Sequence, residues 1–209
     1  MVRLAFLDVD GVILDSFDNI MSAMNTILAH YGREPITAEE FRATELHGFE
    51  IFLRERGVDQ GIPWSDIEPV IDGYFRRQQE ACPERSGIRR VLKHIRRRQV
   101  PMYLISACGP DITRAKLEKH RGLPSFFSEI HGTENKVWII AHICEDLDIS
   151  PEETIFVSDM ERDFLGCREL GITCVGLQSE FSTPERLRPA SDLWFQNHTE
   201  LLKWLKSLP

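Results

Sequence analysis

The chain lacks any apolar run long enough to cross a membrane, and it has no Cys-x-x-Cys pair. A membrane helix needs about 20 consecutive apolar residues, so no membrane partner is expected. Five cysteines, an odd number without paired spacing, are typical of reduced thiols rather than a disulfide framework or zinc site. The apolar stretch after Met1-Val2-Arg3 is too short for a signal peptide. We therefore expect a cytoplasmic protein.

A Gly-x-Gly-x-x-Gly loop is also missing, which leaves a dinucleotide site with little support. Positive charge is in deficit, because the formal net charge is -8, and this disfavours nucleic acid as a partner. What is present is an ordinary globular composition, with 42% hydrophobic and 28% charged residues. A chain of 209 residues is long enough for one domain with a sizeable insert.

Short apolar runs alternate with helical patterns along most of the chain. Runs of this kind, typical of strands buried on both faces, cover residues 4–7, 102–105, 154–157 and 172–175, with a closing strand at 193–195. Residues 88–95 keep the i, i+3, i+4, i+7 spacing of an amphipathic helix, and residues 137–144 keep it less regularly. This alternation predicts an α/β fold, a doubly wound Rossmann-like parallel sheet whose ligands lie beyond the carboxyl ends of its strands.

Residues 16–84 interrupt the alternation, because they carry helix signals and no convincing strand. An apolar stripe spans residues 17–31, and Thr37 with Glu40 and Ser65 with Glu68 have the spacing of capping boxes. Residues 57–63 have the composition of a connecting loop. We predict a helical cap domain at 16–84, inserted into a core formed by 1–15 and 85–209.

The segment Asp8-Val9-Asp10-Gly11 follows directly on the first predicted strand. Carboxylates at i and i+2 lie on one side of an extended chain, so their charges repel unless a proton or cation lies between them. A hard cation with oxygen ligands, most plausibly Mg²⁺, would remove that conflict. The same pattern also occurs in turns and calcium loops, so by itself it is a modest signal.

Three further elements follow strands or begin helices, and each has an ordinary alternative. Ser106 follows a strand and can donate to a phosphoryl oxygen, although serines often end strands through local turns. Lys136 lies near a helix start, which is the poorer end for a cation, or is simply a solvated lysine. Asp159 and Asp163 follow another strand and would share one face if a helix began there, or they serve as helix-capping acids.

Taken together in this order, these elements resemble the haloacid dehalogenase (HAD) superfamily, specifically its phosphatase-like members with a helical cap after the first strand (phosphoglycolate phosphatase and beta-phosphoglucomutase-like proteins). The matching residues are Asp8 to Val12, Ser106, Lys136, and Ser158 to Asp163. The resemblance extends over essentially the whole chain, including the position of the cap.

The resemblance implies a Mg²⁺-dependent phosphatase acting on a small phosphorylated metabolite. Asp8 would attack phosphorus to give an aspartyl phosphate, and Asp10 would serve as acid and then base. Mg²⁺ would be held by the Asp8 carboxylate, the Asp10 backbone carbonyl and Asp159, with Asp163 in a supporting or water-mediated place. Ser106 and Lys136 would hold the phosphoryl oxygens.

Single residues distinguish among the other reactions that the resemblance to this superfamily implies. The presence of Asp10 disfavours carbon–halogen cleavage, because the dehalogenases after which the superfamily is named lack this second aspartate. Residues 16–84 contain no lysine, which speaks against phosphonate cleavage through a cap Schiff base. A sugar-phosphate mutase on the same core stays open, as does a phosphate-binding or regulatory module with weak turnover.

Substrate contacts from the cap, and the surroundings of the site, are less defined by the sequence. The cap has six arginines against thirteen acidic residues, so it offers no general polyanion surface, and Arg42 and His47 are weak candidates for substrate contact. Cys108 follows Ser106 closely and is expected to be a small buried thiol, with a redox role as the lesser alternative. Trp138 and Trp204 fit either core packing or a dimer surface, so the protein is expected to be a monomer or homodimer.

Overall fold

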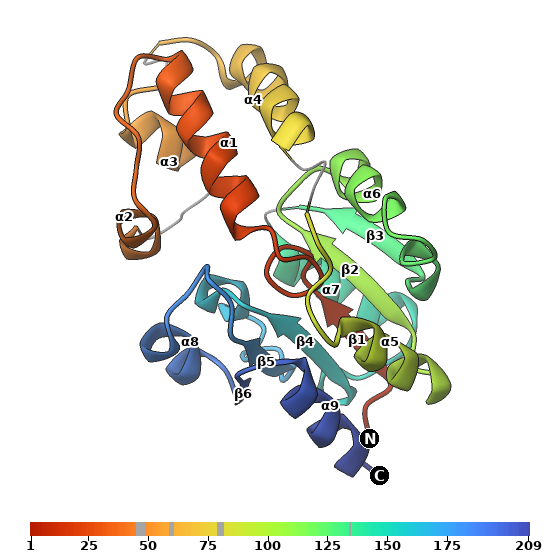
Figure 1. The fold of residues 1–209 in the computed structure, drawn as a ribbon. Helices are drawn as coiled ribbons and strands as arrows, with labels where there is room; N and C mark the ends of the chain where they lie inside the picture. Colours follow the sequence, from red (N-terminus) through yellow and green to blue (C-terminus); the bar gives the residue numbers. More distant parts are fainter. Residues whose placement is uncertain (45–48, 59–60, 79–81, 134) are drawn as a thin grey trace. The chain divides into compact units, whose positions relative to one another are not determined.

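The computed structural model describes residues 1–44, 49–58, 61–78, 82–133 and 135–209, and these form two compact units. One unit joins Met1–Asp15 to Pro83–Pro209, and the other is Ser16–Cys82, as Figure 1 shows in red to yellow. The sequence prediction places the second junction after residue 84, two residues beyond the division seen here.

The first unit is built on a six-stranded parallel sheet in the order β3-β2-β1-β4-β5-β6. Its strands are β1 (Leu4–Leu7), β2 (Met102–Ser106), β3 (Glu129–Gly132), β4 (Thr154–Ser158), β5 (Thr173–Leu177) and β6 (Leu193–Phe195). The predicted doubly wound α/β fold is therefore confirmed. Strand order reverses between β1 and β4, and ligands of such sheets bind beyond the carboxyl ends at that point.

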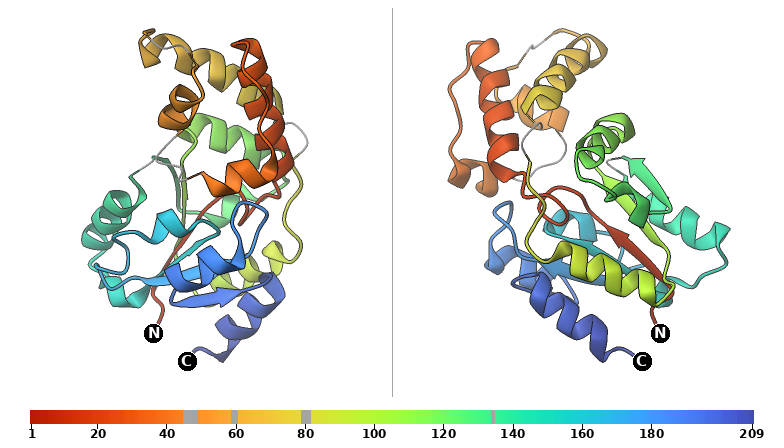
Figure 2. Two further views of the ribbon diagram at one scale, coloured as in Figure 1. Left: turned by 90° about the vertical axis from the view of Figure 1, so that its left-hand side faces the viewer. Right: turned by 45° about the vertical axis from the view of Figure 1, so that its right-hand side comes forward.

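Helices cover both faces of this sheet (Figure 2). The alternation of side chains along β1 sends Leu4 and Phe6 into a cluster with Ile140 and Ile143 of α7 (Lys136–Asp146). Ala5 lies toward the opposite face, where it lines a small cavity with residues of α5 (Ile88–Arg97) and α9 (His198–Ser207). The other helical segments of this unit are α6 (Pro110–Glu118), η2 (Pro124–Phe126), η3 (Pro151–Glu153), η4 (Glu161–Phe164) and α8 (Pro184–Ala190).

Strand β3 is absent from the sequence-based prediction. Its residues, Glu-Ile-His-Gly, contain one apolar side chain, and none of the four is fully buried. An edge strand has a neighbour on one side only and needs no continuous apolar run. The five predicted strands were recognisable because β1, β2 and β4 are buried throughout and the β5 and β6 sequences are apolar.

The second unit contains α1 (Phe17–His30), α2 (Ala38–Ala43), α3 (Phe49–Glu55) and α4 (Trp64–Gln78). Phe41 of α2 packs against α1 and α3, since its ring makes edge-on contacts with Phe17 at 5.9 Å and Phe52 at 6.3 Å between centroids. The predicted capping box at Thr37 is confirmed, because its hydroxyl accepts from the Glu40 amide while the Glu40 carboxylate accepts from the Thr37 amide.

The second predicted capping box is wrong. Helix α4 begins at Trp64, so Ser65 lies inside its first turn, and the hydroxyl instead lies 3.4 Å from the Asp66 carboxylate. Pro63 directly precedes the helix, and its ring fixes φ at that position. Within the described residues, none of the helices combines the length and apolar character that a membrane crossing requires.

Candidate active site

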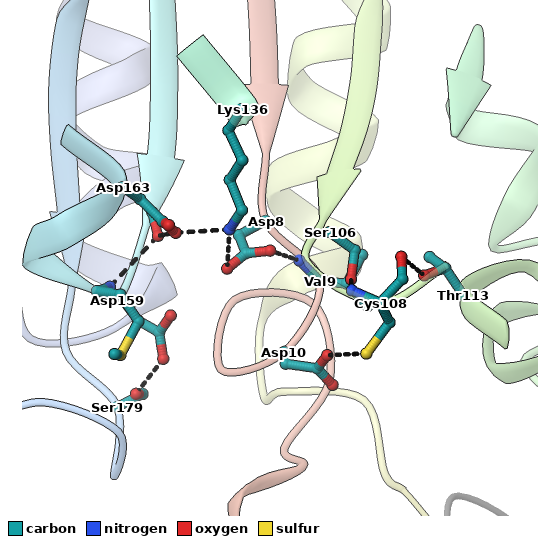
Figure 3. A network of polar contacts seen from close by, with 12 residues as sticks. Asp8, Val9, Asp10, Ser106, Cys108, Thr113, Lys136, Asp159, Asp163 and Ser179 are labelled. Carbon is teal, nitrogen blue, oxygen red and sulfur yellow. Dashed lines mark hydrogen bonds and ion pairs between the residues drawn. The ribbon is translucent and has the colours of Figure 1, made fainter. Parts of the chain in front are cut away.

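Asp8 directly follows β1, the strand between β2 and β4. Its amide donates to the Val157 carbonyl at 2.9 Å, which continues the ladder with β4 past the end of the strand. Its carboxylate accepts from the Val9 amide at 2.8 Å. Because neighbouring parallel strands end at the same edge, Ser106 at the end of β2 and Ser158 at the end of β4 flank it. The predicted convergence at this edge is found in the structure (Figure 3).

Lys136 bridges two buried carboxylates. Its ammonium lies 3.0 Å from Asp8 Oδ2 and 2.6 Å from Asp163 Oδ2, and only 6% of its side chain is exposed. It is the first residue of α7, whose start therefore aims the side chain at the strand ends. Burial opposes the charged form, but the charges of Asp163 and Asp8 outweigh it and raise the lysine pKa. Lys136 is thus a fixed cation beside the candidate nucleophile.

Asp163 lies in the 3₁₀ helix η4, whereas Asp159 lies before it. The α-helix considered from sequence does not begin here, so the two carboxylates do not share a helix face. Asp163 Oδ2 accepts from the Ser158 hydroxyl at 2.6 Å as well as from Lys136. Burial alone would raise the pKa of Asp163, but Lys136 then lowers it below its usual value. Asp163 therefore remains ionised and orients Lys136.

Asp159 lies against the backbone of Gly11. A Cβ at Gly11 would collide with Oδ2 of Asp159, and Gly11 has a φ of 73°, so a glycine is required for two reasons. The Ser179 hydroxyl, in the loop after β5, donates to Oδ2 (Figure 3). The other oxygen, Oδ1, is buried without a hydrogen-bond partner among the described residues. Such an orphaned carboxylate oxygen calls for a ligand.

The charges of this cluster are unbalanced. Lys136 supplies one positive charge against the carboxylates of Asp8, Asp159 and Asp163. Burial is the largest cause that raises the pKa of Asp8 to about 7, with further contributions from Asp163 and Asp10. Burial and the charge of Asp8 likewise raise the pKa of Asp159 well above its ordinary value. A cation between Asp8 and Asp159 would restore the balance.

A hard divalent cation fits this donor set. Asp8 and the orphaned Asp159 offer carboxylate oxygens, and the Asp10 backbone carbonyl is the third predicted ligand. The Asp163 carboxylate is already engaged by Lys136 and Ser158, which matches a supporting place. Among the described residues no three His, Cys, Asp or Glu side chains gather as a ready-made metal cluster. The predicted set must therefore be completed by the backbone and water, as is usual for magnesium.

The Asp10 side chain is bound differently from that of Asp8. Its two oxygens lie 3.0 and 2.9 Å from the ammonium of Lys116, a buried residue of α6 that the sequence analysis missed. Cys108 completes the contact, with its sulfur 3.9 Å from Asp10 Oδ2. Lys116 could have been noticed because it shares the buried face of α6 with Ile112 and Thr113.

The other predicted residues that the structure describes make local contacts. The buried Ser106 hydroxyl accepts from the Cys108 amide at 3.1 Å. Cys108, expected to be a small buried thiol, is only partly buried, yet desolvation still raises the pKa of its thiol, which disfavours the thiolate that oxidation requires. Arg42 lies with its guanidinium 5.0 Å from the Phe17 ring centre, a contact inside the second unit. His47 lies outside the described residues.

Comparisons with known proteins place this chain in a family. The family model of the haloacid dehalogenase-like hydrolases matches residues 5–177. A phosphoglycolate phosphatase from Pseudomonas putida is 25% identical over 190 residues, covering 84% of this chain and 69% of that protein. A 5′-nucleotidase from Pseudomonas aeruginosa is 24% identical over 196 residues, covering 87% and 85%.

A solved structure supports the same fold. The haloacid dehalogenase-like hydrolase from Streptococcus pneumoniae superimposes with a TM-score of 0.81 at 19% identity, over 97% of this chain and 98% of that one. The matched range, residues 5–177, runs from β1 to β5. This chain belongs to the haloacid dehalogenase-like hydrolase family.

Proposed function

We propose that the protein hydrolyses a small phosphomonoester through an aspartyl phosphate on Asp8, with Mg²⁺ as its metal. The observation that carries the proposal is the Asp8 carboxylate, buried at the sheet's carboxyl edge beside the Lys136 ammonium at 3.0 Å and close enough to Asp159 to raise its pKa. This arrangement supplies a nucleophile, a fixed positive charge and a place for a cation.

The reaction divides into two steps. An Asp8 oxygen forms a bond to phosphorus as the bond from phosphorus to the leaving oxygen breaks, and Asp10 gives that oxygen a proton. In the second step Asp10 takes a proton from water, whose oxygen attacks the phosphorus and frees Asp8 and inorganic phosphate. Lys136 and Ser106 stabilise the negative charge of the phosphoryl oxygens during both transfers.

The Mg²⁺ site comprises Asp8, Asp159 and the Asp10 backbone carbonyl, with Asp163 in support. When bound, the metal supplies positive charge that neutralises the phosphoryl oxygens and reduces repulsion of the anionic nucleophile. Ser179 and Gly11 set the position of the Asp159 carboxylate before the metal arrives. These two residues are the supporting partners that such ligands need.

The test is phosphate release from a panel of esters with either Mg²⁺ or EDTA present. The panel begins with 2-phosphoglycolate and nucleoside 5′-monophosphates, suggested by the two curated relatives, and adds sugar phosphates. We expect metal-dependent release from at least one ester. Phosphoryl transfer from a sugar bisphosphate to a sugar, without release, would replace hydrolysis by mutase activity. If neither phosphate release nor phosphoryl transfer is observed, the protein would be a phosphate-binding module.

Affinity for Mg²⁺ should fall as the pH falls through about 7. The metal-free Asp8 carboxylate has a pKa of about 7, so below that value the ion must displace a proton. The affinity for Mg²⁺ should fall about tenfold per pH unit when one proton is displaced, and more steeply when Asp159 also holds a proton. Calorimetric titrations at about pH 6 and about pH 8 in two buffers would count the protons released. An affinity unchanged over this range would contradict the proposed ligand role of Asp8.

A further inference from the structure

Lys116 is an unusual residue to find inside the core unit. It occupies α6, its side chain is 1% exposed, and its ammonium lies within 3.0 Å of both oxygens of Asp10. Taking an ammonium out of water costs several kcal/mol unless it is paired and hydrogen-bonded. The buried neighbours on the same helix face are Ile112, Thr113 and Leu117, where an apolar side chain would pack without that cost. The ion pair with Asp10 therefore offsets the cost of burying this ammonium.

The contact restrains a side chain that would otherwise be free to rotate. Asp10 lies in the loop between β1 and the second unit, and 15% of its side chain is exposed. The ammonium contacts both oxygens, while the Cys108 thiol approaches Oδ2 at 3.9 Å and the ammonium itself at 3.6 Å. Oδ2 therefore has two neighbours that hold it, and Oδ1 has the lysine. Two anchored points define the plane of the carboxyl group.

We propose that Lys116 is a positioning residue that holds the Asp10 carboxyl group in place for proton transfer, through its contacts with both carboxyl oxygens. The inference rests on the proposed function, in which Asp10 protonates the leaving oxygen and later accepts a proton from water. Both transfers require the carboxyl group to be held within about 0.5 Å of the productive geometry. Lys116 itself contacts neither the reacting phosphorus nor the metal in this scheme.

The test compares two esters that differ in their need for an acid. An alkyl phosphate must have its leaving oxygen protonated, whereas p-nitrophenyl phosphate releases an anion that is stable by itself. In Lys116→Met, kcat/KM for the alkyl ester should fall about 10- to 100-fold, a part of what general acid catalysis contributes. For p-nitrophenyl phosphate kcat/KM should change less than about threefold, while the phosphoenzyme accumulates because its hydrolysis still needs a base.

Two comparisons separate positioning from damage to the fold. Lys119→Met makes the same substitution at an exposed residue of the same helix end and should leave both esters unaffected. In an Asp10→Asn background, Lys116→Met should cause no further loss, because its effect passes through Asp10. Should Lys116→Met fold poorly, Lys116→Gln keeps one donor for Oδ2 and permits the same comparison with a smaller expected loss.

The possible failures are distinguishable. Equal losses for both esters in Lys116→Met, or additive losses in the double variant, would overturn the positioning role while wild-type hydrolysis stands. Unchanged alkyl-ester hydrolysis in Lys116→Met would overturn it as well. A wild type that releases phosphate from no ester of the panel would overturn both this inference and the proposed function.

Discussion

Asp8→Asn is expected to abolish phosphate release and, at the same time, to make the metal-free protein more stable. The activity falls because an amide cannot take the place of the carboxylate that attacks phosphorus, and a loss of at least about 10³-fold in kcat is expected. Phosphate release with Mg²⁺ measures this part. Residual turnover close to the wild-type value would mean that Asp8 is not the nucleophile.

The gain in stability follows from the pKa of the same carboxyl. Burial and neighbouring acids raise it from 3.8 to about 7 in the folded protein. The folded state therefore binds more protons than the unfolded chain between these values, and the free energy of unfolding falls as the pH rises through this window. Above it the charge costs about 4 kcal/mol, from 1.36 kcal/mol per pKa unit. Asparagine carries no charge and avoids this cost.

The expected gain is about 4 kcal/mol at about pH 8, because the raised pKa of Asp8 already includes the attraction of Lys136. Below about pH 4 the Asp8 carboxyl of the wild type is protonated, and the two proteins should have similar free energies of unfolding. Denaturant unfolding in EDTA at both pH values measures the difference. Asp146→Asn, at an exposed site of α7 whose side chain is 64% exposed, is the control and should change stability by less than about 0.5 kcal/mol. A destabilised Asp8→Asn at high pH would contradict this reasoning.

The sequence was informative where chemistry follows directly on a buried strand. Asp8 and Ser106 stand at the ends of apolar runs, and the carboxyl ends of neighbouring parallel strands must meet. Their proximity thus followed from a fold that the alternation of strands and helices already predicted. Lys136 required the family's order of motifs in addition, because a lysine at a helix start has no local pattern that assigns it to the site.

Contacts that depend on packing could not be read in the same way. Lys116 meets Asp10 across 106 positions of sequence, and the register of α6 against the sheet decides which of its residues points inward. Ser179 reaches Asp159 through the path of a loop, for which the sequence gives no period. Strand β3 was missed because pairing with β2 on one side stabilises a segment without an apolar pattern. In each case tertiary structure outweighed the local signal.

Lys136→Met is the second change with a large expected effect, this time on stability. It removes the ammonium that lies 3.0 Å from Asp8 and 2.6 Å from Asp163, and leaves both carboxylates buried. Breaking such a buried ion pair by deleting one partner costs about 3–5 kcal/mol. This loss is a large part of the about 5–15 kcal/mol that stabilises a typical domain. Denaturant unfolding at about pH 8 measures the loss, with Lys136→Arg as the variant that keeps the charge.

The loss should shrink in acid, and this distinguishes electrostatics from a packing defect. Lys136 now holds the pKa of Asp163 below its usual value, so in the wild type this group contributes stability that is lost as the pH falls through that pKa. Without Lys136, burial raises the pKa values of Asp8 and Asp163 in the folded protein. The folded state then binds protons at a higher pH than the unfolded chain, so the free energy of unfolding rises as the pH falls. The two proteins should therefore converge towards about pH 4. An equal deficit at both pH values would point instead to a contact that does not titrate in this range, such as that of the ammonium with the Phe156 ring, whose centre lies 6.0 Å away.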